Sequence, residues 1–260
     1  MEQGLFRLAA SLALLLACGS VFAQSPGDAQ GYPGRPIRII VANTAGSALR
    51  DFAPVSLVIT SIQLLASHPS VAATNVPELL ALARARPGQL NCGSSGAGSS
   101  NHLACAMLDV LGQVDIVHVP FKGTVPQQTG LMSGQVQIAF ASIPTTMTHV
   151  KAGKLRVLGQ GGPKRSPLLP DLPTIAETLP GFQATTWYAL LAPRGTPAAI
   201  VQRLNAEVVK ALSDSPVAQR LIRLGLDPAP CTPAELTAYL KAETERYGRI
   251  VKQAGLAGGK

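Results

Sequence analysis

The feature that most constrains the fold is a regular alternation of short apolar runs and helical patterns between residues 89 and 160. The runs "QLNCG", "DIVHVPF", "QVQIAFAS" and "KLRVLGQ" have strand character, and helix-like segments such as "SSNHLACAMLDVLG" separate them. In that segment Leu103, Met107 and Val110 share one face. Strands that alternate with helices predict βαβ units, so we expect an α/β protein with mostly parallel sheets.

The segments before this alternation have a different character. "RPIRIIVA" (35–42) is typical of a buried strand, and "DFAPVSLVITSIQLLA" (51–66) is β-branched and extended. "NVPELLALARARPG" predicts a helix that Asn75 caps, with Glu78 three residues later and Pro87–Gly88 as the stop signal. The chain is therefore expected to enter the alternating segment through an extended run and one capped helix.

The C-terminal part is mainly helical. A Pro-rich, loop-like stretch, "GGPKRSPLLPDLPTIAETLPG", leads to a strand, "TTWYALLAP". Three helices are expected to follow. Thr196 is the expected cap of the first, Ser215–Pro216 opens the second and Gly225 ends it, and the capping box "TPAE" (232–235) opens the third.

The N-terminus has the pattern of a targeting segment. Arg7 precedes the apolar run "LAASLALLLACGSVFA", which ends in small residues at Ala23 and is too short and too early to favour a membrane span. We therefore expect a signal peptide over residues 1–23 and a periplasmic protein. A minor alternative is a lipoprotein signal, "LLAC", with Cys18 as the lipid-bearing residue.

The charge is positive but dispersed. The formal net charge is +8, and the Lys and Arg residues are scattered singly along the chain. Nucleic-acid-binding proteins concentrate basic residues on one element and interleave aromatic residues for stacking, whereas aromatics are only 4% of this chain. The composition therefore favours a solvated basic surface and no nucleic-acid partner.

The loop "SSGAGSSNH" (94–102) is the most informative local motif. Its two glycines allow a tight turn, and Ser99 or Ser100 can cap the helix that follows. The unpaired N–H groups of that first helical turn can hold an anion without a cationic side chain. The same residues are equally compatible with an ordinary Gly/Ser turn. A phosphate-binding P-loop would need a lysine, a dinucleotide fingerprint a glycine at Asn101, and a nucleophile elbow a glycine at Ala97.

No catalytic or metal-binding constellation stands out. His68, His102, His118 and His149 lack metal-ligand spacing, so a structural or surface role is favoured for each. No nucleophile–base pair is evident, so we expect neither an enzyme nor a cofactor. The remaining cysteines are odd in number and irregularly spaced; buried thiols are the default, and one disulfide stays possible. They are Cys92, Cys105 and Cys231.

Segments through most of the chain, in order, resemble one protein family. They include "YPGRPIRIIV", "DFAPVSLV", "LNCGSSGAGSSNHLA", "VDIVHVPFKG", "LMSGQVQIAF", "VKAGKLRVLG", "KRSPLLPDLPTIAE" and "LLAPRGTPAAIVQRLNAEVVKAL". This order is similar to that of the Bug family, the extracytoplasmic solute-binding receptors of tripartite tricarboxylate transporters. The resemblance implies a type II periplasmic-binding-protein-like fold: two α/β lobes, joined by crossing strands, that close on a small carboxylate. It also implies membrane permease subunits as partners.

The resemblance assigns the ligand mainly to backbone amides and ordered waters. Lobe one would comprise residues 32–67 and 159–260, and lobe two residues 68–158. Ala141 departs from the polar or acidic residue that relatives often have there, which leaves that contact undefined. The expected ligand-binding residues are Ser94, Ser95, Gly96, Gly98, Ser99, Ser100, Lys122, Gly123, Ser142, Ala45 and Gly46. Taken alone, a lysine such as Lys122 in an exposed loop is more often an ordinary solvated side chain than a ligand contact.

A second departure lies near the N-terminus. In relatives a "PPGG…D" loop, a long helix and further strands separate the first strand from "DFAPVSLV", whereas here only "NTAGSALR" (43–50) does. A βαβ crossover needs about 12 or more residues, so lobe one is expected to be truncated. The segment Thr44–Ser47 is either a remnant of the ligand loop or the junction of a deletion. The alternative function is therefore a deletion remnant that binds weakly or not at all.

Overall fold

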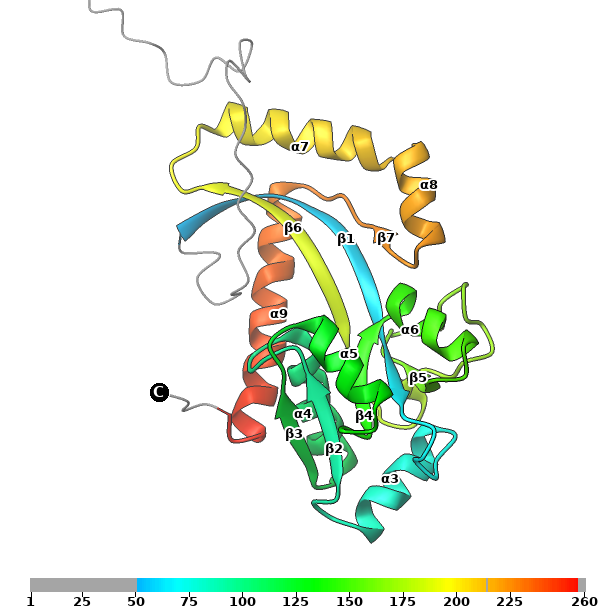
Figure 1. Cartoon of the computed structure of the whole chain (residues 1–260). Helices are drawn as coiled ribbons and strands as arrows, with labels where there is room; N and C mark the ends of the chain where they lie inside the picture. The colour runs from blue at the N-terminus through cyan, green and yellow to red at the C-terminus, as the bar shows by residue number, and fades with distance from the viewer. Residues whose placement is uncertain (1–50, 214, 257–260) are drawn as a thin grey trace, which may run out of the picture.

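The protein is represented by a computed structural model that describes residues 51–213 and 215–256 (Figure 1). The expected signal peptide 1–23 with Cys18, the strand 35–42 and the segment Thr44–Ser47, with Ala45 and Gly46, lie outside the described residues. The elements in chain order are β1 (Phe52–Ser67), α3 (Val76–Ala85), β2 (Leu90–Ser94), α4 (Ser100–Gly112), β3 (Ile116–Pro120), α5 (Thr124–Met132), β4 (Ile138–Ser142), α6 (Ile143–Lys151), β5 (Arg156–Gln160), the 3₁₀ helix η3 (Ile175–Glu177), β6 (Thr185–Pro193), α7 (Ala198–Leu212), α8 (Pro216–Arg223), β7 (Asp227–Pro228) and α9 (Pro233–Gln253).

Strand β1 is the element that joins the molecule together. Its 16 residues run through both halves in Figure 1. The first part of β1 pairs with β6 and β7, and its last residues pair with β4 and β5. We call β3-β2-β4-β1-β5 with helices α3–α6 the lower half, and β6-β1-β7 with α7 and α8 the upper half. Helix α9 lies alongside both halves and packs on β1 and α4 (Figure 1).

The expectation of mostly parallel sheets is wrong, because the sheet is mixed. Strands β3, β2 and β4 are parallel to one another, as their helical crossovers require. However, β1 is antiparallel to each of its four partners, and in the lower half it lies between β4 and β5. The alternation therefore predicted the common direction of the four strands within it, but it held no information on the long strand that enters from the upper half.

Most local sequence signals act as expected. Asn75 caps α3, and the Ser215 side chain caps α8. The Thr232–Glu235 capping box opens α9. The expected Thr196 cap is wrong: within the described residues, α7 begins after Pro197 without a side-chain cap. Instead the Thr196 hydroxyl donates to the Pro193 carbonyl at 2.7 Å and closes the preceding turn.

Helix α4 is buried on a broader surface than its sequence pattern predicted. Met107 is buried, but Leu103 and Val110 are only partly so. The buried surface instead includes Cys105 and Leu108, because α4 packs against the sheet and also against α9. The main core lies in this part of the molecule, between the lower sheet and its helices.

The expected division into lobes at 68–158 and 159–260 stays a prediction. Residue 159 falls inside β5, whose Gly159 and Gln160 pair with β1 in the lower sheet. The loop that follows also contributes Ile175 and Phe182 to the main core. The elements that pack around the lower sheet therefore extend past residue 158.

Candidate functional site

The loop between β2 and α4 is the structural centre of the candidate site. Strand β2 ends at Ser94 and helix α4 begins at Ser100, as the sequence predicted. Ser99 caps the helix, since its hydroxyl accepts the His102 amide at 3.3 Å. Gly96 and Gly98 have φ values of +143° and +76°, a region that side-chain-bearing residues rarely adopt. The two glycines are thus required by the turn itself.

Some of the loop's amides are engaged within the protein and others are not. Four donate internally: Ser95 to Asn101 Oδ1 at 3.3 Å, Gly96 to Ser94 Oγ at 3.2 Å, Gly98 to His102 Nδ1 at 2.9 Å, and Ser99 to the Gly96 carbonyl at 3.2 Å. Among the amides of residues 95–101, those of Ala97, Ser100 and Asn101 have no acceptor within the described part of the chain. The donors that remain for an anion therefore cluster at the first turn of α4.

A buried amide network supports the loop from beneath. The Asn101 side chain accepts from Ser95 Oγ at 3.0 Å and from Ser99 Oγ at 2.6 Å, and it donates to Gln127 Oε1 at 2.8 Å. Gln127 in turn donates to the carbonyls of Gly93 and Phe140 at 2.9 and 3.1 Å. Sequence reasoning missed this role of Asn101 and Gln127, because 26 residues separate the two amides.

A disulfide joins the strand before the loop to the helix after it. Cys92 of β2 and Cys105 of α4 are bonded, with their Cα atoms 6.2 Å apart. The default expectation of buried thiols is therefore wrong for these two, and the open alternative of one bridge is the one observed. The remaining thiol, Cys231, is partly buried and accepts a hydrogen bond from the Leu57 amide. The bridge fixes the two ends of the Ser94–Ser99 loop relative to each other.

Two histidines lie against the inner side of this loop. The rings of His102 and His118 are stacked with centroids 3.7 Å apart. His118 Nε2 lies 2.6 Å from Ser94 Oγ, and His102 Nδ1 accepts the Gly98 amide. Burial lowers the pKa of His102, and burial together with the neighbouring His102 lowers the pKa of His118 to about 4. Both rings are therefore neutral near pH 7.

The other expected residues of the lower half lie at the same edge of the sheet. The Gly123 amide donates to the Ser95 carbonyl at 3.0 Å, and the exposed Lys122 is the residue immediately before Gly123. Ser142, at the end of β4, hydrogen-bonds to Thr145 at 2.9 Å. Carboxyl ends of parallel strands are where α/β sheets bind ligands. The expected residues from β2, β3 and β4 are thus brought to one edge.

The edge faces the point where β1 and β6 cross between the halves. Ser100 Oγ lies 3.3 Å from Thr186 Oγ1 of β6, which accepts from Gln63 Nε2 of β1 at 3.0 Å. Gln63 is 3% exposed and is the register partner of Ser142. Gln63 and Thr186 were not predicted, since nothing in their local sequence distinguishes them from other strand residues.

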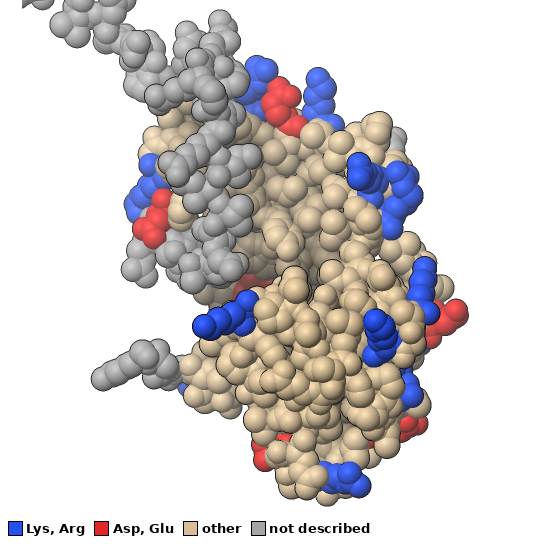
Figure 2. Space-filling view, in the orientation of Figure 1, with Lys and Arg blue, Asp and Glu red and all other residues tan. Residues whose placement is uncertain are grey.

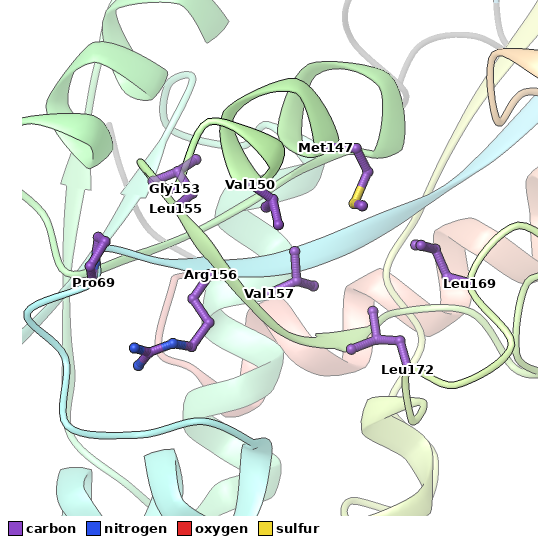
Figure 3. A pocket seen from close by; sticks show the side chains of 9 residues that line it. All are labelled: Pro69, Met147, Val150, Gly153, Leu155, Arg156, Val157, Leu169 and Leu172. Carbon is purple, nitrogen blue, oxygen red and sulfur yellow. The ribbon is translucent and has the colours of Figure 1, made fainter.

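The most clearly formed cavities lie elsewhere. One of about 410 Å³ lies between α6, β5 and the loop after β5, and its lining is mainly apolar (Figure 3). A second, of about 500 Å³, is adjacent to it and includes His68 and Lys154. Among the described residues that line these two cavities, none is an expected ligand-binding residue.

Neither the surface charge nor the placement of metal-binding side chains, among the described residues, marks a further site. Figure 2 shows Lys and Arg side chains dispersed over the visible face, singly or in small groups. Within residues 51–213 and 215–256, no group of three or more His, Cys, Asp or Glu side chains is placed to hold a metal. Within the same residues, no helix combines the length and apolar character needed to span a bilayer.

Comparison with known proteins identifies the family. Residues 42–256 match the family described as the tripartite tricarboxylate transporter family receptor, TctC. This chain belongs to the TctC family. The resemblance seen in the sequence is thereby confirmed. So is the expectation that the chain is not an enzyme, because the family consists of solute-binding receptors.

Solved structures of TctC-family relatives share the fold. The chain is 34% identical to Rpa4515 of R. palustris with adipate, with a TM-score of 0.75 over 83% of this chain and 73% of that one. MatC (Rpa3494) from Rhodopseudomonas palustris with bound malate gives 34% identity and a TM-score of 0.69 over 77% and 69%. The periplasmic binding protein BugD is 28% identical to this chain, with a TM-score of 0.70 over 78% of this chain and 69% of BugD. The periplasmic-binding-protein-like α/β fold is therefore confirmed.

Two curated relatives of the TctC chain are longer than it is. It is 38% identical to a protein encoded in the tcbD–tcbE intergenic region of Pseudomonas sp. strain P51, over 78% of this chain and 61% of the relative. It is 30% identical to BugT of Bordetella pertussis, over 80% of this chain and 64% of BugT. The chain thus spans less than two thirds of the length of these relatives.

Proposed function

We propose that this chain is an exported receptor that captures a small carboxylate and delivers it to the membrane permease subunits of a tripartite tricarboxylate-type transporter. The observation that carries the proposal is the cluster of unengaged amides on Ala97, Ser100 and Asn101, at the first turn of α4. A carboxylate is the ligand that such a cluster stabilises, through hydrogen bonds and the helix dipole. Relatives with adipate and malate support the same ligand class.

In this proposal the ligand lies between the lower edge and the crossing strands. Lys122 and Gly123 approach from one side and Ser142 from another, while the Ser94–Ser100 loop supplies the amides. Ala45 and Gly46 would supply the contacts of the other lobe. Export follows from the proposed signal peptide over residues 1–23.

A second candidate is a remnant that binds weakly or not at all. The specific observation in its favour is the small core of the upper half, where the buried apolar clusters are Val55, Ala192, Val201 and Leu57, Leu236, Leu240. The short coverage of the curated relatives agrees with a truncated lobe one. In this case the lower edge would be intact but would have no opposing lobe to close on it.

A proline substitution at Ser100 tests the amide cradle most directly. Ser100 is the first residue of α4, where proline is well tolerated, and Ser99 has φ −68° and ψ 160°, which suits a residue before proline. Ser100→Pro therefore removes one unengaged donor without breaking a helical hydrogen bond. The matched control, Ser100→Ala, removes the hydroxyl contact with Thr186 but keeps the amide.

Calorimetric titration with adipate, malate and a cationic amino acid separates the two candidates. A receptor should bind one of the dicarboxylates and not the cation. Ser100→Pro should weaken that binding about 10- to 100-fold, since hydrogen bonds to charged groups contribute about 1.5–3 kcal/mol, and Ser100→Ala should weaken it much less. Equal losses in the two variants would contradict the cradle. Absence of dicarboxylate binding in the unsubstituted protein would favour the remnant.

A further inference from the structure

We propose that the stacked imidazoles of His102 and His118 are positioning residues for the Ser94–Ser99 loop, and that their protonation releases the loop from its ligand-binding shape. Each ring holds a different part of the loop. His118 bonds to Ser94 at its start, and His102 bonds to the Gly98 amide near its end. The inference rests on the proposed function for its consequence in binding, although the loop geometry itself can be tested without a ligand.

The bond to Gly98 requires a neutral ring. A backbone N–H is always a donor, so the Nδ1 atom 2.9 Å from it must be unprotonated, which places the ring proton of neutral His102 on Nε2. A proton added to Nδ1 would set two donors against each other. This bond keeps the Gly98 amide turned inward, while the amides of Ala97 before it and of Ser100 two residues after it have no acceptor among the described residues.

Protonation of both rings would add electrostatic repulsion between them. Because the centroids are 3.7 Å apart, two imidazolium rings would be held in direct contact. Ser94 Oγ also serves the loop, since it accepts the Gly96 amide at 3.2 Å and lies 3.1 Å from the Gly96 carbonyl. Displacement of His118 would therefore disturb the start of the loop, and displacement of His102 would disturb its end.

Charged groups lie on three elements around the two rings. They are Asp109 of α4, Asp115 and Lys122 beside β3, the paired Glu243 and Arg246 of α9, and the exposed Glu235, Lys241, Glu245, Arg249 and Lys252 of the same helix. Among these described groups, none contributes to the lowered pKa of either ring, which burial causes first and, for His118, the other ring second. The two rings therefore titrate as a coupled pair.

The sign of the pH dependence follows from these directions. Each ring has a lower pKa in the folded loop than the ordinary 6.5, and that of His118 is about 4. The hydrogen bonds to the neutral rings therefore stabilise the loop fully above about pH 6.5. This stabilisation is lost progressively as the pH falls towards about 4. At pH 5 the population of the released loop, relative to the ligand-binding shape, should be at least about tenfold higher than at pH 7.5. The reason is that a histidine ring in the released loop regains its ordinary pKa and binds a proton more readily.

Hydrogen exchange of the Gly98 amide tests this in the ligand-free protein. Its protection factor, corrected for the intrinsic exchange rate, should fall at least about tenfold between about pH 7.5 and pH 5. The double variant His102→Asn/His118→Gln keeps an acceptor near each position and cannot titrate, so its protection should change less than about threefold. His102→Phe has no acceptor and should lose protection at both pH values. His149→Gln, a histidine on α6 away from the loop, should behave like the unsubstituted protein.

A separate experiment titrates adipate into the protein at the same two pH values. The double variant is its control, because any change in its affinity with pH reflects protonation of adipate itself. Loss of affinity at low pH in the unsubstituted protein but not in the double variant is expected. No adipate or malate binding at about pH 7.5 would refute the proposed function and leave the Gly98 result standing. A constant Gly98 protection factor, or an equal fall in the double variant, would overturn the inference. If the double variant does not fold, NMR titration of the two rings decides, and pKa values at or above 6.5 for both would overturn it.

Discussion

The lower and upper halves share one long strand, but they bury apolar surface very differently. In the lower half a continuous core extends from Leu65 on β1 through Leu108 and Phe140 to Ile250 on α9. Among the described residues of the upper half, two clusters are buried, each with three members, and most of β6 is only partly covered. The difference is not one of sequence character, because both halves supply amphipathic helices. It lies in how many of the described helices pack around each part of the sheet.

Helices α3 and α7 show the same contrast at residue level. Four apolar residues of α3 are buried, among them Leu79 and Leu80. The apolar residues of α7 that recur at i, i+4 spacing are Ile200, Leu204, Val208 and Leu212, and of these only Leu212 is buried. An amphipathic pattern therefore shows which face of a helix can be buried, and the number of neighbouring elements determines how far it is buried.

Matched leucine truncations should give the largest difference between the halves. Leu79→Ala on α3 removes a side chain that is 0% exposed, and should lower the free energy of unfolding by about 2–5 kcal/mol. Leu204→Ala on α7 removes a partly buried one and should cost about 1 kcal/mol or less. Chemical denaturation with two probes, one in each half, measures both. Equal costs would show that the upper half is packed as tightly as the lower.

Two ion pairs extend the comparison with a smaller expected effect. Arg246 on α9 bonds to Glu243, whose side chain is 11% exposed, and to the Gln183 carbonyl at 2.6 Å. Arg246→Ala would leave that carboxylate largely buried without its partner and should cost about 2 kcal/mol. Arg203→Ala on α7 breaks a pair with side chains 52% and 55% exposed, and should cost less than about 0.5 kcal/mol. Denaturant midpoints of the two variants would show whether this order holds.

The same contrast explains what sequence reasoning could and could not predict. Strands β2–β5 and helices α3–α6 follow from local patterns, because their apolar residues, turn glycines and caps lie close together in the chain. The insertion of β1 between β4 and β5 does not follow from local patterns, because strand order depends on pairing between segments that are distant in the chain. For the candidate site, Gly96, Gly98 and the α4 cap were readable. The Asn101–Gln127 network and the stacked histidines were not, because they arise only when β2, α4 and β3 come together.

The smallest expected effect concerns apolar side chains that the upper half leaves in solvent. On α8, Val217 is 54% and Ile222 44% exposed, and Leu224 just after it is 46% exposed. Ile222→Ser removes little buried surface, so its free energy of unfolding should stay within about 0.5 kcal/mol of the unsubstituted protein.

Ile222→Ser should nevertheless reduce self-association, because exposed apolar patches favour it. Light scattering against concentration, beside an Ile250→Ser variant, provides the measurement. Ile250 is 8% exposed in the main core, so that substitution should instead destabilise the fold. If Ile222→Ser proved as destabilising as Ile250→Ser, the side chain of Ile222 would have to be covered in solution. The upper half would then be more complete than its described residues show.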